Sequence, residues 1–265
     1  TRLPAKEYVK RIKENGGIGF LAHPLEKRSS MKEHPPYPWI EWDTNDFTGI
    51  EIWNHMSEWM ENLTEQNKYQ SFMHPLRTII SPTKEIFELW DRLSLERKVV
   101  GIGGVDAHAH KINLLGFFEV EVFPYKVLFK SIRTHILSTE KIVINSSAET
   151  ITKTKQIILN ALKEGKCFVS NFYQGDAKGF KFEICCNEKV FTMGDKVKLS
   201  NDLFLNVVVP EKIATIKIIH NGKEIFSVKD SSAELKVSSE GIYRAEVWNE
   251  SKGWIFSNHI RVELN

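Results

Sequence analysis

The chain has 265 residues, of which 42% are hydrophobic and 26% are charged, and its formal net charge is +2. These proportions are ordinary for a globular protein and exclude a disordered chain, a collagen-like chain and a coiled coil. The near balance of charge predicts neither a nucleic-acid partner nor a membrane partner, and no apolar run reaches the roughly 18 residues that a membrane helix needs.

The first two thirds of the sequence is predicted to alternate helices with short, wholly apolar strands. The predicted helices are residues 4–15, ended by Gly16 and Gly17, residues 82–98, capped by Ser81 ahead of Pro82, and a helix that opens at the capping box 146–149 and runs to Lys163. The predicted strands are residues 18–22, 49–53 and 99–105. Apolar strands that alternate with helices indicate parallel β/α units. Residues 24–48, rich in proline and tryptophan, are expected to form a loop over one end of the sheet.

The pattern changes after Asn171, where helical periodicity ends and short strands separated by turn signals follow. The predicted strands are residues 180–185, 203–208, 214–220, 224–228, 234–237, 243–248 and 255–262. Several short strands at this spacing are typical of a β-sandwich, and the sequence around Tyr243 resembles the tyrosine corner of immunoglobulin-like domains. The sequence therefore predicts two domains: an α/β domain over residues 1–174 and an immunoglobulin-like β-sandwich over residues 175–265.

Cysteine usage and the first residues bear on the compartment. Cys167, Cys185 and Cys186 are an odd and sparse set, which favours reduced thiols over a disulfide framework. The charged first residues lack the apolar stretch of a signal peptide, so a cytoplasmic protein is expected. Because the chain opens inside a predicted helix and without Met, we also expect part of the parent protein to precede residue 1.

Candidate chemistry follows three of the predicted strands. His23, ahead of Pro24, ends the first strand, and Asp106 and His108 follow the third. Alternate residues of an extended segment share a face, so Asp106 and His108 are expected to point to the same side. A carboxylate and a neutral imidazole are ligands that Zn²⁺, Mn²⁺ and Fe²⁺ accept. A histidine that merely ends a strand, and a polar loop with chance histidines, are the alternatives.

Glu51 is the third candidate, because it lies inside the apolar second strand. A buried carboxylate costs several kcal/mol unless it is paired or binds a metal. A strand-end glutamate paired with a nearby Arg or Lys is an equally good interpretation. Parallel strands place their carboxyl ends at one edge of a sheet, so the three candidate segments are expected to converge there.

The order of these segments resembles a known family. Gly16-Gly17 followed by His23-Pro24, then Gly49–Asn54, then Asp106-Ala-His108, is similar to the PHP (polymerase and histidinol phosphatase) superfamily, and most similar to its carbaryl-hydrolase-like branch of metallohydrolases. The resemblance continues through residues 125–165 and into the carboxyl-terminal residues 243–258, so it spans nearly the whole chain.

The resemblance implies a distorted β/α barrel that holds two or three divalent metal ions and hydrolyses phosphoesters. His23 matches the family's A-H-P ligand, Asp106 and His108 match its closing D-x-H ligands, and Glu51 lies in the motif after A-H-P. The family's opening H-x-H motif, its Asp-His motif and its bridging Glu do not precede His23. The chain therefore resembles the carboxyl-terminal part of such a barrel.

The function expected from this resemblance is metal-assisted hydrolysis of a small-molecule phosphoester by Zn, Mn or Fe, with an incomplete catalytic domain in this chain. His110 and His55 are candidates for moving a proton or contacting substrate, although each is also compatible with an ordinary surface histidine. An oligomer is possible. The alternative function is a binding or scaffold protein whose barrel is degenerate and whose β-sandwich is the working part.

Overall fold

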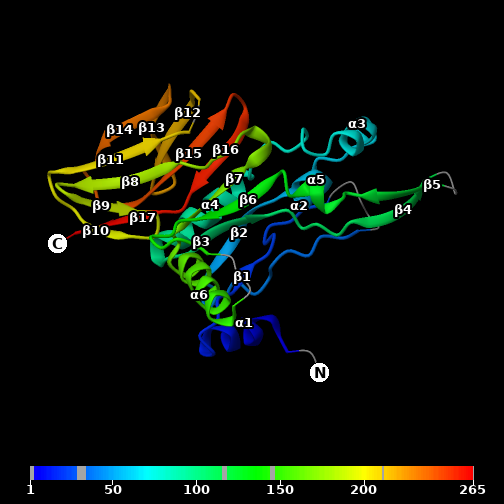
Figure 1. Ribbon diagram of the computed structural model, residues 1–265, viewed down its shortest axis with the longest axis horizontal. Coiled ribbons are helices and arrows are strands. Elements are labelled where there is room, and N and C mark those ends of the chain that lie inside the picture. The colour runs from blue at the N-terminus through cyan, green and yellow to red at the C-terminus, as the bar shows by residue number, and fades with distance from the viewer. Residues whose placement is uncertain (1–2, 29–33, 115–117, 144–146, 211, 265) are drawn as a thin grey trace.

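The computed structural model describes residues 3–28, 34–114, 118–143, 147–210 and 212–264 as a mixed α/β structure (Figure 1). The helices are α1 (Ala5–Glu14), α2 (His55–Glu61), α3 (Lys68–Met73), α4 (Lys84–Glu96), α5 (Tyr125–Leu128) and α6 (Ala148–Glu164). The strands before residue 175 are β1 (Phe20–Leu21), β2 (Gly49–Asn54), β3 (Val100–Gly104), β4 (His110–Leu114), β5 (Phe118–Val122), β6 (Ile132–Ile136) and β7 (Cys167–Asn171). In the described residues, no helix is both long and apolar enough to cross a membrane.

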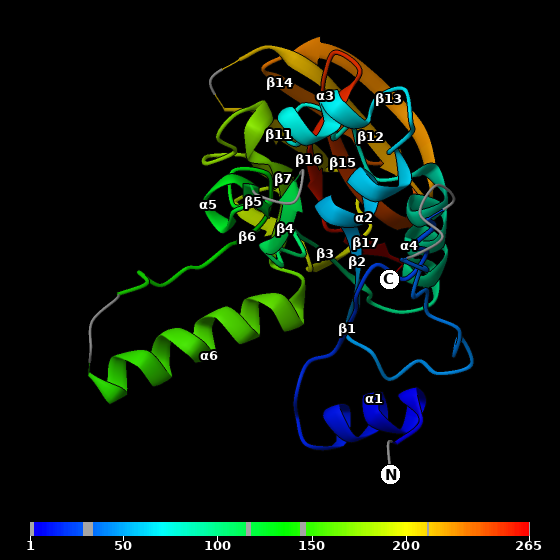
Figure 2. The same cartoon turned by 90° about the vertical axis from the view of Figure 1, so that its right-hand side faces the viewer.

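The first sheet is parallel, with strand order β1-β2-β3, as the alternation of strands and helices predicts. Its strands are apolar because both faces are covered: Ile50, Ile52 and Trp53 of β2 are buried in one core with Trp90 of α4. Over the described residues this sheet is not closed into a barrel. Figure 2 shows α1 and α6 together at one end of the molecule, beyond the sheets.

The helix starts differ from those predicted. Thr83, not Ser81, is the N-cap of α4, where its side chain accepts a hydrogen bond from Ile86 N at 3.4 Å. The shift follows from Pro82, which lies before the cap rather than at the first helical position. Ser147 caps α6 by accepting from Thr150 N at 3.2 Å, while Ser146, the predicted start of that capping box, lies outside the described residues.

Two antiparallel pairs were not predicted. β4 and β5 form a hairpin that extends away from the rest of the chain (Figure 1), and β6 pairs antiparallel with β7. Both pairs depend on partners that sequence periodicity alone does not specify, and the short strands resemble loop segments.

The strands after residue 175 form two facing layers. They are β8 (Lys181–Cys186), β9 (Lys189–Thr192), β10 (Lys196–Lys198), β11 (Leu203–Val208), β12 (Ala214–His220), β13 (Lys223–Asp230), β14 (Ser232–Lys236), β15 (Gly241–Asn249), β16 (Lys252–Ser257) and β17 (Ile260–Glu263). A four-stranded sheet, β14-β11-β8-β9, packs on an eight-stranded sheet that contains β15 and β16. Tyr243 Oη donates to Ser239 O at 2.8 Å, as the resemblance to a tyrosine corner predicts.

Among the strands after residue 175, one predicted strand is wrong and two strands were not predicted. Residues 255–262 are two strands rather than one, because the chain turns at Asn258 and His259, whose side chains bond to the first half of the molecule. β9 and β10 have only four and three residues and were not predicted.

The larger sheet extends beyond the expected domain boundary. Its strand order is β10-β17-β15-β16-β7-β6, so β7, from before residue 174, is hydrogen-bonded to β16 near the end of the chain. The register pairs Ile255 with Ser170 and Ser257 with Phe168. The boundary between residues 174 and 175 remains a prediction, and one continuous sheet crosses it.

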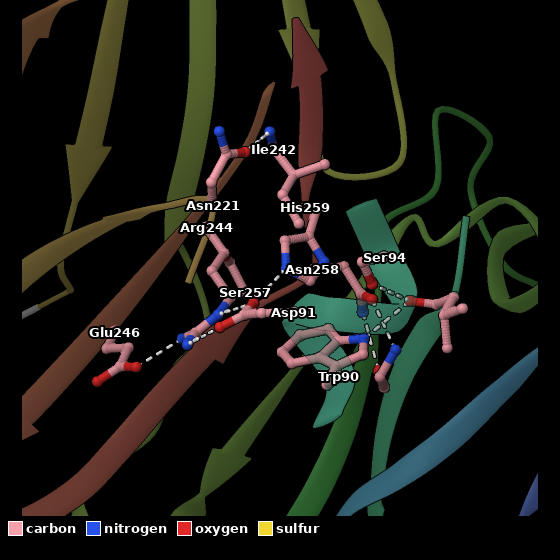
Figure 3. A network of polar contacts seen from close by, with 12 residues as sticks. Trp90, Asp91, Ser94, Asn221, Ile242, Arg244, Glu246, Ser257, Asn258 and His259 are labelled. Atoms are coloured by element: carbon pink, nitrogen blue, oxygen red, sulfur yellow. Dashed lines mark hydrogen bonds and ion pairs between the residues drawn. The ribbon is translucent and has the colours of Figure 1, made fainter. Parts of the chain in front are cut away.

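A buried ion network joins α4 to the larger sheet (Figure 3). The guanidinium of Arg244, on β15, donates from Nε and Nη2 to the two carboxylate oxygens of Asp91, each at 2.8 Å. Arg244 Nη1 donates to Glu246 Oε1 at 2.5 Å, and His259 Nε2 lies 2.8 Å from Asp91 Oδ1. Burial alone would raise the pKa of Asp91, but its hydrogen bonds from Arg244 and His259 outweigh burial and lower that pKa to about 2.

Asn258 makes a second connection between the two halves. Its Oδ1 accepts from Gly101 N at 2.7 Å, and its Nδ2 donates to Gly101 O and to Cys167 O at 2.9 Å each. These bonds link the loop before β17 to the start of β7 and to β3. The α/β half and the sandwich half are therefore held together by polar groups as well as by the continuous sheet.

Candidate functional site

Three of the sequence-predicted site residues lie near one another on or directly after β1, β2 and β3. His23 follows β1, Glu51 lies on β2, and Asp106 follows β3. His23 N donates to Glu51 Oε2 at 2.7 Å. Burial raises the pKa of Glu51, and the charges of both His23 and Asp106 act on that carboxyl group. The predicted convergence of these segments at one edge is therefore present in the structure.

His23 and Asp106 share an unusual backbone conformation. Their φ angles are +32° and +50°, in the left-handed region that non-glycine residues seldom occupy. Such conformations cost about 1–3 kcal/mol each and cluster at ligand sites, where they aim a side chain. Each strand therefore ends with a turn that directs a metal-binding type of side chain to the edge of the sheet.

Glu51 is held by its neighbours. Asn54 Nδ2 donates to Glu51 Oε2 at 3.0 Å, so this oxygen accepts two hydrogen bonds. Gly104 lies against the other oxygen, because a Cβ at that position would be 2.8 Å from Glu51 Oε1. The alternative interpretation, an ion pair with Arg or Lys, is not what the described residues form: Glu51 accepts hydrogen bonds from the backbone amide of His23 and the side-chain amide of Asn54.

Glu26 is a site residue that the sequence analysis missed. Its buried carboxylate lies beside the His23 ring, with Oε2 at 3.5 Å from His23 Nδ1, and accepts hydrogen bonds from Arg28, Ser57 and the Tyr37 backbone. Burial would raise the pKa of Glu26, but these hydrogen bonds together lower it. His23 Nδ1 is itself buried without a hydrogen-bond partner among the described residues. In the sequence, the position of Glu26 three residues after His23 is the feature that could have indicated this contact.

His108 and His110 lie farther out. The His108 side chain is half exposed, and its Nδ1 is 2.9 Å from Asp106 O but 3.6 Å from Asp106 Oδ1. Its ring stacks on that of His110, at the start of β4, with ring centroids 5.1 Å apart. Within the described part of the chain, no three or more His, Cys, Asp or Glu side chains are grouped so as to hold a metal ion.

His55 is not a surface histidine, contrary to one of the two interpretations above. It begins α2 directly after β2 and is fully buried. Its Nδ1 lies 2.5 Å from Ser131 Oγ, whereas its Nε2 has no hydrogen-bond partner among the described residues. Burial lowers the pKa of His55 from near 6.5 to about 4, so the imidazole is neutral at neutral pH.

Because the folded chain resists protonating His55, stability is expected to fall in mild acid. Between pH 6.5 and 4 the unfolded chain binds a proton that the folded chain does not, so unfolding is favoured by about 3 kcal/mol as pH falls through this window. Urea unfolding at several pH values checks this. His55→Asn, which keeps a polar group near Ser131, should flatten the dependence, whereas the exposed-site control His74→Asn should not. Equal pH profiles for all three proteins would contradict the expectation.

Asn171 is a second residue that the sequence analysis missed. β7 runs in the same direction as β3, since Cys167 lies beside Gly101 and Val169 beside Gly103. Asn171 therefore ends β7 at the same edge as the other strand ends. It is fully buried, its Oδ1 accepts from Tyr173 N, and its Nδ2 has no partner among the described residues. In the sequence, a polar residue directly after an apolar segment is the feature that could have indicated Asn171 as a site residue.

A small hollow of about 60 Å³ lies beside this edge. Its polar lining consists of His23, Glu26, Glu51, Asn54, Ser57, Glu58, Glu61, Ser81 and Thr83. Burial raises the pKa of Glu58 to about 7, even though its carboxyl group accepts hydrogen bonds from Trp53 Nε1 and the Ile80 and Ser81 backbone. The lining is rich in carboxyl groups and has one imidazole.

Comparison with known proteins does not assign the chain to a family. No protein-family model matches the chain, and no curated protein matches it. Among solved structures, the endo-β-1,4-mannanase from Thermotoga petrophila aligns with 98% of this chain at 12% sequence identity and a TM-score of 0.24. The chain spans 60% of the length of that structure. A TM-score this low supports no conclusion about fold or function.

Proposed function

We propose that the chain is part of the catalytic domain of a divalent-metal-dependent hydrolase that acts on a small-molecule phosphoester. The observation that carries the proposal is that His23 and Asp106 follow the ends of two parallel strands on either side of Glu51, which lies on the strand between them, with His23 and Asp106 both in the left-handed backbone region. The proposal includes a partial PHP-type barrel, followed by an immunoglobulin-like β-sandwich.

The donor chemistry at this edge suits a transition metal. His23 offers a buried Nδ1 that makes no hydrogen bond to a described residue and lies 3.5 Å from Glu26 Oε2, and Asp106 offers a carboxylate near His108. In the proposal, His23, Asp106 and His108 hold Zn, Mn or Fe, and Glu51 either joins them or orients the His23 backbone. Without a bound ion, the described residues form no ready group of three ligands.

A bound divalent metal would supply a hydroxide near neutral pH and neutralise charge on the phosphoryl oxygens. The chain's own residues have separate parts. Asn54 and the His23 backbone N–H hold the Glu51 carboxylate in place. His55 is neutral and fixed by Ser131, which leaves Nε2 as a donor or acceptor in a site shielded from water. His110, exposed beside His108, is the candidate to exchange a proton with solvent.

The second candidate function is a binding or scaffold protein with a degenerate barrel. The half-exposed His108, turned toward the Asp106 backbone, is the observation that favours it. Under this alternative the β-sandwich is the working part, and the loss of Asp106 has no effect on function.

Isothermal titration of the purified chain with Zn²⁺ and with Mn²⁺ tests the proposal. We expect at least one ion per chain to bind, and His23→Ala to weaken binding about 10- to 100-fold, on the scale of changes close to a metal. His74→Ala, which removes an exposed histidine elsewhere, should bind like the parent chain. Absence of binding, or equal binding by His23→Ala and the parent, would reject a metal site at this edge.

A further inference from the structure

A separate cavity lies where the two halves of the chain meet. Its volume is about 350 Å³, within the range of roughly 300–1,000 Å³ found for small-molecule sites. It is lined by His135 and the residues that follow it on and after β6, by Phe168 of β7, and by residues around the start of β8 and the end of β9. Junctions between structural units are places where such sites are common.

This cavity is on the other face of β6 and β7 from the candidate metal edge. Thr134 and Val169 face β3, since Thr134 Oγ1 bonds Gly103 and a Cβ on Gly103 would meet the Val169 side chain. His135 and Phe168, the adjacent residues in each strand, point the opposite way because side chains alternate along a strand. A ligand in the cavity would therefore be separated from His23 and Asp106 by the sheet.

The floor of the cavity is apolar and contains aromatic rings. Phe168, Phe180 and Met193 are buried, and the two phenylalanine rings meet edge to face with centroids 5.1 Å apart. The His135 ring lies parallel to that of Phe168, with an interplanar angle of 3° and centroids 4.5 Å apart. His135 Nε2 is 2.8 Å from Ser170 Oγ, so the imidazole is fixed in this orientation. These rigid ring surfaces suit a planar apolar group.

The rim of the cavity is charged. Lys178 and Lys181 line it, and both residues are exposed. Glu183, two residues along β8 from Lys181, is the one carboxylate in the lining. Two ammonium groups and one carboxylate leave a single net positive charge at the rim. A monoanion would balance this charge, whereas a dianion such as a phosphate monoester would bring excess negative charge beside Glu183.

We propose that this cavity binds a small aromatic monocarboxylate, with its ring beside the stacked rings of His135 and Phe168 and its carboxylate at Lys178 and Lys181. The inference does not depend on the proposed hydrolase function. It depends on the size of the cavity, the stacked aromatic rings in its lining and the net charge of its rim.

Titration of the full chain with 2-naphthoate, followed by its fluorescence, tests the inference. Saturable binding of one molecule per chain is expected, and Lys181→Met should weaken it about tenfold or more, the loss that removal of a hydrogen bond to a charged group causes. Lys229→Met, at an exposed lysine on β13, is the matched control and should bind like the parent. Leu137→Trp, which fills the cavity from the face that His135 also lines, should abolish binding while circular dichroism confirms that the variant is folded.

Two further ligands separate the ring from the charge. 2-Naphthol, which lacks the carboxylate, and 2-naphthyl phosphate, which carries a second negative charge, should both bind more weakly than 2-naphthoate. Equal binding of 2-naphthol would overturn the role of the lysines, and tighter binding of the phosphate would overturn the choice of a monoanion. No saturable binding of 2-naphthoate, or binding unchanged in Leu137→Trp, would overturn the site itself.

Discussion

Arg244→Ala is expected to lower the free energy of unfolding by about 3–5 kcal/mol, because it leaves the buried carboxylates of Asp91 and Glu246 without their shared cation. For a chain of this length, a loss of that size lowers the melting temperature by roughly 6–20 °C. Thermal and urea unfolding measure both quantities. Arg92→Ala is the matched control, since Arg92 is the exposed neighbour of Asp91 on α4, and it should change stability by less than about 0.5 kcal/mol.

A double replacement separates the ion pair from the packing. Asp91→Leu with Arg244→Met removes both charges and keeps similar volumes, so it should recover much of the stability lost in Arg244→Ala. In that variant the buried side chains of His259 and Glu246 lose Asp91 and Arg244 as their polar partners, which limits the recovery of stability. An Arg244→Ala protein that is as stable as Arg92→Ala would mean that the network does not hold α4 to the larger sheet.

Asp106→Asn is expected to weaken the binding of Zn²⁺ or Mn²⁺ by about 100-fold or more, the upper end of what changes around a metal cause. Asparagine matches the size of aspartate and tolerates the left-handed backbone, in which Asp106 has a φ of +50°. The substitution therefore removes the charge and leaves the turn intact. Calorimetric titration of the variant measures the affinity.

The matched control is Asp202→Asn, in an exposed turn remote from the strand ends, which should bind metal as the parent does. Hydrolysis of a phosphodiester by metal-loaded protein should fall together with affinity in Asp106→Asn. Metal binding or hydrolysis that is unchanged in Asp106→Asn would favour the scaffold function over the hydrolase. The unfolding free energy of each variant shows whether a loss of affinity reflects a loss of folded protein.

The convergence of the strand ends could be predicted from the sequence because it depends on local features. Apolar strands followed by His23-Pro24 and by Asp106 indicate parallel strands whose carboxyl ends share an edge. Hydrophobic periodicity and turn residues were enough for this, and the parallel β1-β2-β3 sheet agrees. The exact helix starts depended on which of Ser81, Pro82 and Thr83 occupies the cap, which composition alone does not decide.

The features of the fold and the site that could not be predicted depend on residues that are distant in the sequence or on local backbone conformation. His55 is buried because it meets Ser131, 76 residues later, and no local pattern indicates that contact. Asp91 and Arg244 are 153 residues apart, and each alone resembles a surface residue of an amphipathic element. The orientation of the His108 ring depends on the turn at Asp106 and Ala109, both of which have positive φ angles that spacing rules do not specify.

The pairing of β7 with β16 has a consequence for synthesis of the chain. β7 ends at residue 171, and its neighbour β16 begins at residue 252, so 81 further residues must be translated before the pair can form. At about 5–20 residues per second, the ribosome needs roughly 4–16 s for that segment. During this interval β7 presents an unpaired strand edge, which is the kind of surface that chaperones cover and that associates with other nascent chains. The first half of this protein therefore completes its fold only after β16 has been translated.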